Sequence, residues 1–540
     1  MVDPIRVDVV IVGAGFSGCL ALHEMRCRGL SARIIEANDG FGGVWHSNRY
    51  PGARVDSILP FYQLTKPEVY RGFTFTEKYP DSSALRDYFS HLDETLNLRT
   101  DTIFGHRVVK ASFSDERATW NFETHRELTA TSRFAIFAGG TTQKPHVPDL
   151  PGLDTFQGQI VHPANWPSDL ELEGKRVGLI GQGASGIQIL EQLAKDNHDI
   201  TLFIRTPCLA VPMQQKTDSM EESQEKKSGY DALFEKAKYG QDAGYPYLPA
   251  TRMFEDETPE QHKQVFEERW SHGGLMATMG YNDITTNADA NATMYRFWRD
   301  KARARMTDRA KMAIVAPTEP FQWIGGKRSA LEQNYFEMID RPNVKLVNLK
   351  KAPISRVTPS GIVVGGEGEG DGDDLHELDV LIFSTGYDSV TGGMYDMNIL
   401  DRHGRSLREK WKDGIHTFAG MMIPDMPNAF LLYGRQAPTA LANGPTFIEL
   451  QVEWIGKVLD GMERRGEEMV EATQEAAREW ADRTFSIWNS LRVRDQDSWW
   501  VGSNIPGKRR EPLIWFGGTK LWWDLCNVGL VDWEPFTSRL

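Results

Sequence analysis

Apolar runs and helical patterns alternate at the start of this chain. Residues 7–12 are mainly apolar and β-branched, residues 18–28 favour a helix, and residues 32–35 form a second apolar run. A short, mainly apolar run is typical of a strand that is buried on both faces, as in parallel sheets covered by helices. The pattern therefore predicts a strand, a helix and a second strand that together form a βαβ unit.

The same order recurs further along the chain. Residues 176–180 and 200–204 are apolar runs, and residues 187–195 between them favour a helix. Two parallel strands need a crossover of about this length, which is usually a helix. The sequence thus predicts a second βαβ unit.

Two other apolar runs indicate how the chain passes between these units. Residues 134–140 and 380–386 both break at glycine and threonine, and residues 144–152 carry three prolines, which is typical of a linker. We therefore expect the first domain to be discontinuous. The expected boundaries are residues 1–143 and 385–540 for the first domain and residues 152–213 and 321–384 for the second.

Residues 214–320 have a different pattern, made of highly charged, helix-forming segments. Thr258 and Gln261 form a capping box around Pro259 at the first helical position, which predicts the start of a helix. We expect this region to be a helical insertion in the second domain. Residues 367–374 are acidic and glycine-rich, but their spacing fits no EF-hand, so they predict a solvated hairpin turn and no metal site.

A glycine fingerprint joins strand to helix in each βαβ unit: GAGFSG at residues 13–18 and GQGASG at residues 181–186. Such glycines permit a tight turn and place a pyrophosphate on the N-terminus of the following helix. Two fingerprints in this context predict two bound dinucleotides, and therefore an α/β fold with two Rossmann-like domains. The residues expected at the pyrophosphates are Gly13, Gly15, Phe16, Ser17 and Gly18 in the first unit and Gly181, Gly183, Ala184, Ser185 and Gly186 in the second.

The two units differ at the residue that reads the adenosine ribose, about 20 positions beyond the fingerprint. In the first unit this residue is Glu36, whose carboxylate can accept the ribose hydroxyls. In the second unit it is Arg205, followed by Thr206. An arginine cannot accept a hydroxyl but can pair with a 2′-phosphate. The first site therefore suits FAD, and the second suits NADPH rather than NADH; an ordinary surface arginine is the alternative for Arg205.

Composition narrows the class of partner. The net charge of −14 argues against nucleic acid and against an anionic membrane surface. The four cysteines form no C-x-x-C pair, which argues against a zinc site and a disulfide reductase. The sequence contains no stretch of 18 apolar residues that would predict a membrane span. The first fingerprint begins so early that no signal peptide is expected before it. We therefore expect a cytoplasmic protein. The terminal Ser538-Arg539-Leu540 is close to the peroxisomal S-K-L address, with an ordinary polar terminus as the alternative.

Four segments carry a resemblance to a known family. Residues 156–167 contain F-x-G-x-x-x-H-x-x-x-W-P, which resembles the fingerprint of Baeyer–Villiger monooxygenases, class B flavoproteins that turn ketones into esters or lactones. Residues 42–56 (GGVWHSNRYPGARVD), 325–337 and 497–508 are similar to three further segments of the family, the last being its mobile C-terminal loop. Trp166 favours this branch, because related N- and S-oxygenating flavoproteins typically carry Tyr or Phe there.

The resemblance implies a reaction and two catalytic residues. NADPH would reduce FAD, and O₂ would then form a C4a-peroxyflavin anion that attacks a ketone carbonyl. Arg328 would stabilise that anion and the following adduct, since arginine does not deprotonate in proteins. Asp56 would position Arg328. The alternatives are a solvated surface pair for Lys327 and Arg328 and a helix cap for Asp56.

The resemblance also implies further cofactor contacts. Lys327 would join Arg205 and Thr206 at the 2′-phosphate, and Trp499 would close over the nicotinamide and help to exclude water. Residues expected around the flavin are Gly43, Val44, Trp45, Tyr62 and Gly444, with Val108 at the adenine and Asp56 beside the ring.

Other aromatic and histidine residues are expected to be structural. His162 and Trp166 lie in the connection between domains, so we expect a conformational role and no general base. We expect the C-terminal tryptophans to pack in the core and the lid; they are Trp500, Trp515, Trp522, Trp523 and Trp533.

Three features depart from the family pattern. Gln182 and Ala184 stand where members often carry hydroxyl residues, which removes side-chain contacts to the NADP pyrophosphate but not the backbone ones. FAGGTT at residues 137–142 differs from the usual form, and the charged insertion is not explained by the motifs. The competing functions are an N- or S-oxygenating flavin monooxygenase and a flavin- and nicotinamide-binding sensor or uncoupled oxidase.

Overall fold

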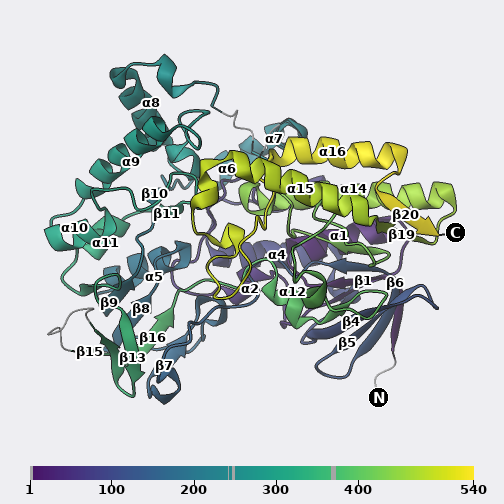
Figure 1. Ribbon diagram of the computed structural model, residues 1–540, viewed down its shortest axis with the longest axis horizontal. Coiled ribbons are helices and arrows are strands. Elements are labelled where there is room, and N and C mark those ends of the chain that lie inside the picture. Colours follow the sequence, from purple (N-terminus) through teal and green to yellow (C-terminus); the bar gives the residue numbers. More distant parts are fainter. Residues whose placement is uncertain (1–3, 241–242, 246–249, 366–372, 540) are drawn as a thin grey trace.

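The computed structural model describes residues 4–240, 243–245, 250–365 and 373–539, and two sheets organise the chain (Figure 1). In the larger sheet the strands run in the order β17-β4-β5-β6-β1-β2-β3, with β18 beside β6. Strand β1 lies parallel to both β2 and β6, as expected of a βαβ unit. The bounds are β1 (Ile5–Val12), β2 (Ala32–Ile35), β3 (Thr102–Ile103), β4 (Val108–Ser114), β5 (Thr119–Thr124), β6 (Thr129–Phe137), β17 (Ile399–Leu400) and β18 (Ala429–Leu431).

The smaller sheet contains the second βαβ unit, and its five strands are all parallel, in the order β12-β9-β8-β16-β7. A three-stranded antiparallel sheet, β13-β14-β15, follows β12 in the chain. The predicted turn at residues 367–374 falls almost wholly outside the described residues. The bounds are β7 (Gln159–Val161), β8 (Arg176–Ile180), β9 (Asp199–Ile204), β12 (Val344–Asn348), β13 (Ile354–Thr358), β14 (Gly361–Val364), β15 (Asp374–Glu377) and β16 (Val380–Phe383).

Both fingerprint helices begin earlier than the sequence pattern predicted. Helix α1 (Phe16–Cys27) starts two residues before the expected residue 18, and α5 (Ala184–Lys195) starts three residues before the expected residue 187. The reason is that the last residues of each fingerprint form the first helical turn. Their backbone N–H groups are therefore free at the helix N-terminus, where an anion can bind.

The larger sheet draws strands from both ends of the chain. Strands β17 and β18 follow residue 384, whereas the other six precede residue 138. The smaller sheet likewise combines strands from before and after residues 214–320. This is the strand content that a discontinuous first domain requires; the exact domain boundaries stay a prediction.

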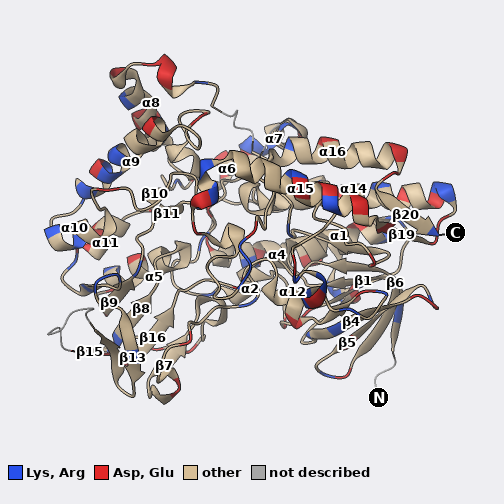
Figure 2. Ribbon diagram, viewed as in Figure 1, with Lys and Arg blue, Asp and Glu red and all other residues tan. Residues whose placement is uncertain are grey.

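The described part of residues 214–320 is mainly helical, as expected of the insertion; α8, α9 and α10 lie at the left of Figure 1, and α6 and α7 lie nearer its upper middle. The parallel pair β10 (Ala210–Pro212) and β11 (Ala330–Glu332) brackets them. Thr258 caps its helix as predicted, with both bonds of the capping box present. Acidic and basic residues are frequent along the outer helices of this region (Figure 2). Its helices are α6 (Met220–Glu225), α7 (Tyr230–Tyr239), α8 (Pro259–His272), α9 (Ala288–Arg303) and α10 (Arg309–Val315).

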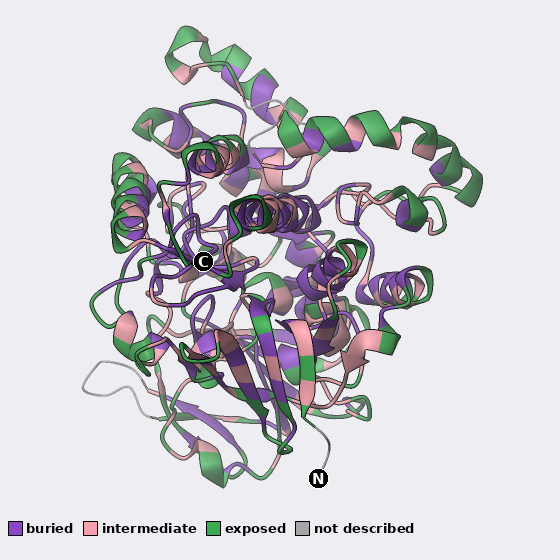
Figure 3. Ribbon diagram, turned by 90° about the vertical axis from the view of Figure 1, so that its right-hand side faces the viewer, coloured by how far each residue is buried: buried purple, intermediate pink, exposed green. Residues whose placement is uncertain are grey.

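The cores lie between the sheets and the helices that cover them, and the helices expose their outer faces (Figure 3). Trp500, Trp515, Trp522 and Trp533 are buried, and Trp523 is half-buried, so the packing role expected for these residues is confirmed. The remaining elements are α2 (Val44–Ser47), α3 (Pro67–Tyr70), α4 (Ser82–Leu96), α11 (Tyr335–Ile339), α12 (Gly392–Asp396), α13 (Leu407–Lys410), α14 (Gly444–Arg465), α15 (Gln474–Ser490), α16 (Gly518–Asp532), β19 (Met469–Ala472) and β20 (Phe536–Arg539).

Three observations concern the excluded classes and the chain end. Within the described residues, no helix is long and apolar enough to cross a membrane, and no cluster of His, Cys, Asp or Glu could hold a metal ion. The four cysteines are free. Ser538 and Arg539 belong to β20, which pairs with β19, and Leu540 lies outside the described part of the chain.

Candidate active site

Arg328 and Asp56 form a two-bonded ion pair between segments that are far apart in the sequence. Arg328 Nε donates to Asp56 Oδ2 at 2.6 Å, and Arg328 Nη2 donates to Asp56 Oδ1 at 2.8 Å. The third contact, from Arg328 Nη1 to the carbonyl of Ala440 at 2.6 Å, leaves the guanidinium fixed in direction. The side chains of Arg328 and Asp56 are 26% and 30% exposed, so Arg328 is not a solvated surface residue. Both carboxylate oxygens of Asp56 accept from Arg328 rather than from the N–H groups of a helix N-terminus.

The pair keeps both groups charged. Burial opposes the charge on each, but the attraction and hydrogen bonds between them outweigh it. The pKa of Arg328 is therefore raised above its ordinary value and the pKa of Asp56 is lowered below its own. A guanidinium in this state is a permanent cation that cannot give up a proton.

Three tyrosines surround the ion pair. Tyr245 donates to Ser57 Oγ at 2.7 Å, Tyr433 donates to the carbonyl of Thr439 at 2.8 Å, and Tyr62 accepts from Trp45 Nε1 at 3.0 Å. Burial raises the pKa of all three, so they stay neutral phenols at physiological pH.

Tyr245 and Tyr433 were not identified from the sequence. Tyr433 stands two residues beyond β18, and the carboxyl ends of parallel strands are where α/β folds place their sites. That rule could have found it. Tyr245 belongs to the helical insertion and follows no pattern, so only the fold brings it to the ion pair.

Glu36 is fixed at the end of β2. It is 5% exposed, its Oε2 accepts from the backbone N–H of Ala14 at 2.6 Å, and its Oε1 accepts from that of Asn38 at 2.7 Å. The carboxylate thus links strand end and fingerprint, at the position expected to read a ribose.

The first fingerprint is tightly packed. A Cβ on Gly18 would lie 1.8 Å from the carbonyl oxygen of Gly13, and a Cβ on Gly43 would lie 3.1 Å from the Cα of Gly15. Gly13 has φ of +108°, which favours glycine. No side chain of the described residues caps α1, and its first turn carries no acid, unlike α4, which Asp81 caps. The N-terminus of α1 is thus open to an anion.

The second fingerprint is more open. Gly181 and Gly186 pack as their counterparts do, since a Cβ on Gly186 would lie 2.5 Å from the carbonyl oxygen of Gly181. A Cβ on Gly183, however, would meet nothing within 4 Å in the described structure, and Gly183 and Ala184 are exposed. Helix α5 has no side-chain cap and no acid in its first turn. Gln182 Oε1 is buried without a hydrogen-bond partner among the described residues, so a polar ligand could use it.

The segment of residues 42–56 connects the two fingerprints. Tyr50 donates to Gln188 Oε1 at 2.9 Å and accepts from Ser185 Oγ at 3.0 Å, both on α5. A Cβ on Gly52 would lie 2.8 Å from the carbonyl oxygen of Gln188. The same segment carries Gly43 at one end and Asp56 at the other, so it sets the first fingerprint, the second fingerprint and the ion pair in one frame.

Cations gather at the carboxyl edge of the smaller sheet. Arg205 directly follows β9 and is exposed, with the half-buried Thr206 next to it. The N–H of Leu349 donates to the carbonyl of Ile204 at 2.8 Å, so Lys350 and Arg205 follow neighbouring strand ends. Burial lowers the pKa of Lys327; Cys208 and Asp497 oppose this shift, and the charges of Arg205 and Lys350 add to it. Lys350 was not identified from the sequence, although it follows β12, which pairs with β9 up to Asn348 and Ile204.

The residues expected around the flavin start from different elements. Val44 and Trp45 open α2 behind Gly43, and Trp45 bonds Tyr62. Gly444 opens α14, whose N-cap residue Asn443 donates Nδ2 to the carbonyl of Phe61 at 2.5 Å. Val108 is the buried first residue of β4. Their contacts with a cofactor stay a prediction.

The Trp499 loop, residues 497–508, docks on the chain beyond β16. Asn504 Nδ2 donates to the carbonyl of Tyr387 at 2.9 Å, and Lys508 Nζ donates to Asp388 Oδ1 at 2.8 Å. Trp499 itself is half-buried in a single turn of 3₁₀ helix.

His162 has a structural environment. Its Nε2 lies 3.0 Å from the carbonyl oxygen of Gly386, its Nδ1 accepts from the backbone N–H of Ala164, and burial lowers its pKa. It thus joins β7 to the crossing beyond β16. Trp166 is half-buried against the core that packs on the smaller sheet. It directly follows the 3₁₀ turn Pro163–Asn165, which begins after His162.

These observations fit two dinucleotides. Each fingerprint site has a helix N-terminus without a side-chain cap, which suits a pyrophosphate. The first site also has a buried carboxylate for a ribose hydroxyl, and the second has a group of cations for a phosphate. Asp56 of the ion pair lies with Tyr50 and Gly43 on the segment that joins them, whereas Arg328 reaches it from a distant part of the chain.

Comparisons with known proteins agree with this geometry. Residues 6–215 match a family model described as flavin-binding monooxygenase-like. The FAD-binding monooxygenase VdtE of Byssochlamys spectabilis is 36% identical over 95% of this chain and 90% of its own length. Cyclopentanone 1,2-monooxygenase of Comamonas sp. (strain NCIMB 9872) is 36% identical over 94% of this chain and 91% of its own length.

A solved structure extends the likeness to the fold. Cyclohexanone monooxygenase from Rhodococcus sp. Phi1, crystallised with NADP⁺, superposes with a TM-score of 0.93 at 31% identity, over 99% of this chain and 100% of the other. The likeness therefore includes both sheets, the insertion and the C-terminal loop.

Proposed function

Because the chain belongs to the flavin-binding monooxygenase family, and within it to the Baeyer–Villiger monooxygenases, we propose that it converts a ketone into an ester or a lactone with NADPH and O₂. Its cofactors are FAD and NADP(H). The observation that carries the reaction type is the fixed ion pair that Arg328 makes with Asp56, which ends the segment joining the two fingerprints.

The two cofactors would be held beside different parts of that segment, FAD near Gly43 and NADP(H) near Tyr50. Gly13 to Gly18 and Glu36 would hold FAD, and Gly181 to Gly186, Arg205 and Lys327 would hold NADP(H). When bound, the flavin supplies the redox chemistry and the activation of O₂, which are properties of the cofactor rather than of the protein.

Arg328 provides positive charge where oxygen acquires negative charge. Insertion of oxygen next to a carbonyl passes through an oxyanion, and a fixed cation stabilises such a charge without reorganising. Asp56 and the carbonyl of Ala440 hold the guanidinium in one direction. Because its pKa is raised, Arg328 cannot protonate the reacting oxygen, which suits attack on a carbonyl rather than on a soft nucleophile.

The neutral tyrosines and the Trp499 loop complete the proposed site. Tyr245 and Tyr433 present phenols near Arg328, and their raised pKa values keep them as hydrogen-bond donors. Docking of the loop through Asn504 and Lys508 would hold Trp499 over the nicotinamide and exclude water.

The test is Arg328→Ala, assayed with a panel of ketones and with thioethers and amines. Loss of one stabilising donor at an oxyanion costs about 100-fold or more, so ester formation should fall at least this far while NADPH still reduces the flavin. Arg328→Lys keeps the charge but not the paired bonds to Asp56, so its rate of ester formation should lie between those of the wild type and Arg328→Ala. Unchanged ester formation in Arg328→Ala would reject this role, and product only from thioethers or amines would favour the N- or S-oxygenating alternative.

A further inference from the structure

The turn that leads into Arg328 is held from two sides. Residues 321–326 precede Lys327, and within them the N–H of Gly326 donates to the carbonyl of Trp323 at 3.0 Å, while Gly325 has φ of +84°. The direction of this turn decides where the Arg328 side chain starts. Its neighbours are therefore candidates for positioning residues.

On one side, residues of the helical insertion form hydrogen bonds to the turn. Asn291 of α9 is 4% exposed; its Oδ1 accepts from the N–H of Ile324 at 3.0 Å, and its Nδ2 donates to the carbonyl of the same residue at 3.1 Å. Trp323 Nε1 donates to the carbonyl of Thr285 at 3.1 Å. The two Asn291 contacts are buried, and the Trp323 contact is part-buried.

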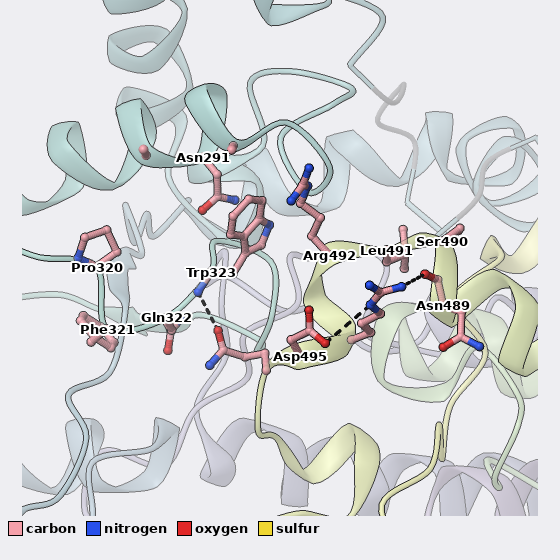
Figure 4. Close-up of a pocket in the computed structure, with 14 residues that line it drawn as sticks. Asn291, Pro320, Phe321, Gln322, Trp323, Asn489, Ser490, Leu491, Arg492 and Asp495 are labelled. Carbon is pink, nitrogen blue, oxygen red and sulfur yellow. Dashed lines mark hydrogen bonds and ion pairs between the residues drawn. The ribbon is translucent and has the colours of Figure 1, made fainter.

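On the other side a single side chain reaches the turn from the segment before the Trp499 loop. Gln496 Oε1 accepts from the backbone N–H of Trp323 at 2.7 Å, the bond drawn as a dashed line below Trp323 in Figure 4. Its Cγ lies 2.9 Å from where a Cβ on Gly326 would be, so Gln496 packs directly over the glycine. Gln496 stands three residues before Trp499 in the chain.

This second contact lies at the edge of a cavity of about 690 Å³ between α9, the turn and residues 489–496 (Figure 4). Asn291 and Gln496 both line this cavity, but Gln496 is half-buried, whereas Asn291 is 4% exposed. A partly exposed hydrogen bond opens more readily than a buried one, so the Gln496 contact is the one that can release while the Asn291 contacts persist.

The Trp499 loop is thereby fixed at both ends. Its far end is bonded to Tyr387 and Asp388 through Asn504 and Lys508. Its near end directly follows Gln496, whose side chain bonds the turn before Arg328. The N–H of Gln496 donates to the carbonyl of Val493 at 3.0 Å. Displacement of the loop would therefore be transmitted to the turn through Gln496.

We propose that Gln496 is a positioning residue that couples docking of the Trp499 loop to the placement of Arg328. It accepts from the backbone of the turn, packs over Gly326 and so holds the guanidinium toward Asp56 while the loop is docked. This inference rests on the proposed function, because its consequence is that activated oxygen is transferred only when both the loop and Arg328 are in place. Loss of the contact would release hydrogen peroxide in place of ester.

The test compares two substitutions of Gln496. Gln496→Met keeps the length of the side chain but removes the acceptor, and Gln496→Glu keeps an acceptor at the same distance. One lost neutral hydrogen bond corresponds to about a fivefold change in an equilibrium. We expect Gln496→Met to raise the share of NADPH that ends as hydrogen peroxide about fivefold, with an unchanged rate of flavin reduction, and Gln496→Glu to restore the wild-type share.

A matched control and a second readout separate this role from general stability. Arg492 ties the same segment to the insertion, through a bond to the carbonyl of Thr286 at 2.9 Å, but does not touch the turn, so Arg492→Met should leave the peroxide share unchanged. Trypsin cleavage of the FAD-loaded protein at Lys508 to Arg510 reports loop docking without any turnover. It should be faster in Gln496→Met than in the wild type, Gln496→Glu or Arg492→Met.

Wild-type cleavage and wild-type peroxide share in Gln496→Met would overturn the inference, as would failure of Gln496→Glu to rescue them. Absence of ester from the wild-type protein with every ketone would instead reject the proposed function, while the cleavage assay would still test whether Gln496 holds the loop.

Discussion

The two fingerprints of this protein share a fold but differ in enclosure. In the first, Gly15 and Gly43 nearly touch, and the buried Glu36 is bonded to two backbone N–H groups. In the second, Gly183 faces open space within the described structure, and Arg205 is exposed.

The difference teaches how one βαβ unit can serve two kinds of cofactor. A carboxylate that is already satisfied by the backbone is costly to rearrange, so the first site is preorganised and suits a cofactor that stays bound. Exposed cations act through charge, which attracts a phosphate from solution and lets it leave, so the second site suits a cofactor that exchanges. The comparison can be broken or sharpened by substitutions that should act on one site only.

The largest effect is expected from Gly18→Ala. Its Cβ would lie 1.8 Å from a backbone oxygen that cannot move without distorting β1, so the loss of stability should be on the order of 4 kcal/mol or more. Gly183→Ala, at the position that corresponds to Gly15, is the control, since its Cβ meets nothing within 4 Å in the described part of the chain. Yield of yellow protein and thermal unfolding should separate the two variants; equal stability would show that the close approach of Gly18 to the carbonyl of Gly13 does not constrain the first fingerprint.

Glu36→Ala should have the next largest effect. It leaves the buried N–H of Ala14 and the half-buried N–H of Asn38 without their acceptor, which costs about 2 kcal/mol, and it removes the proposed ribose contact. We expect the purified protein to lose most of its flavin, measured by the ratio of absorbance at the flavin and protein bands. Glu68→Ala, at an exposed glutamate, is the control. Full flavin retention in Glu36→Ala would contradict the assignment of the first site.

Arg205→Met should affect only the second site. Loss of charge-assisted hydrogen bonds to a phosphate costs about 2 kcal/mol, or roughly 30-fold in affinity. The dissociation constant for NADPH should rise by this factor, the constant for NADH should stay the same, and flavin content should not change. A parallel loss for both nicotinamide cofactors would show that Arg205 does not read the 2′-phosphate.

The smallest effect is expected from Lys350→Met. Lys350 is exposed, and an exposed charge pair contributes about 0.5 kcal/mol, so NADPH affinity should fall by roughly twofold and the effect should vanish in high salt. Lys351→Met, at the next residue, is the control. Equal effects of the two substitutions would mean that Lys350 attracts NADPH only through the overall charge of the protein and makes no specific contact with the phosphate.

Much of the fold was predictable because its signals are local. The strands at residues 32–35 and 176–180 were predicted with their observed bounds, and the cap at Thr258 forms both expected bonds. The helix starts were wrong by two and three residues, because the last residues of each fingerprint form the first helical turn, which a fingerprint read as a loop does not reveal. In the site, Tyr433 follows a short strand with a recognisable end, but nothing near Tyr245 or Gln496 in the sequence indicates their contacts.

By itself the sequence determined the two βαβ units, the two fingerprints and the contrast between Glu36 and Arg205, since each depends on residues that are close along the chain. Arg328 and Asp56 stand 272 positions apart, and only the resemblance to a family linked them before the fold did. The tertiary structure alone decided that Tyr245 from the insertion, Lys350 from a neighbouring strand and Gln496 from the C-terminal segment reach these sites. Such contacts depend on how distant segments pack, and no local periodicity records that packing.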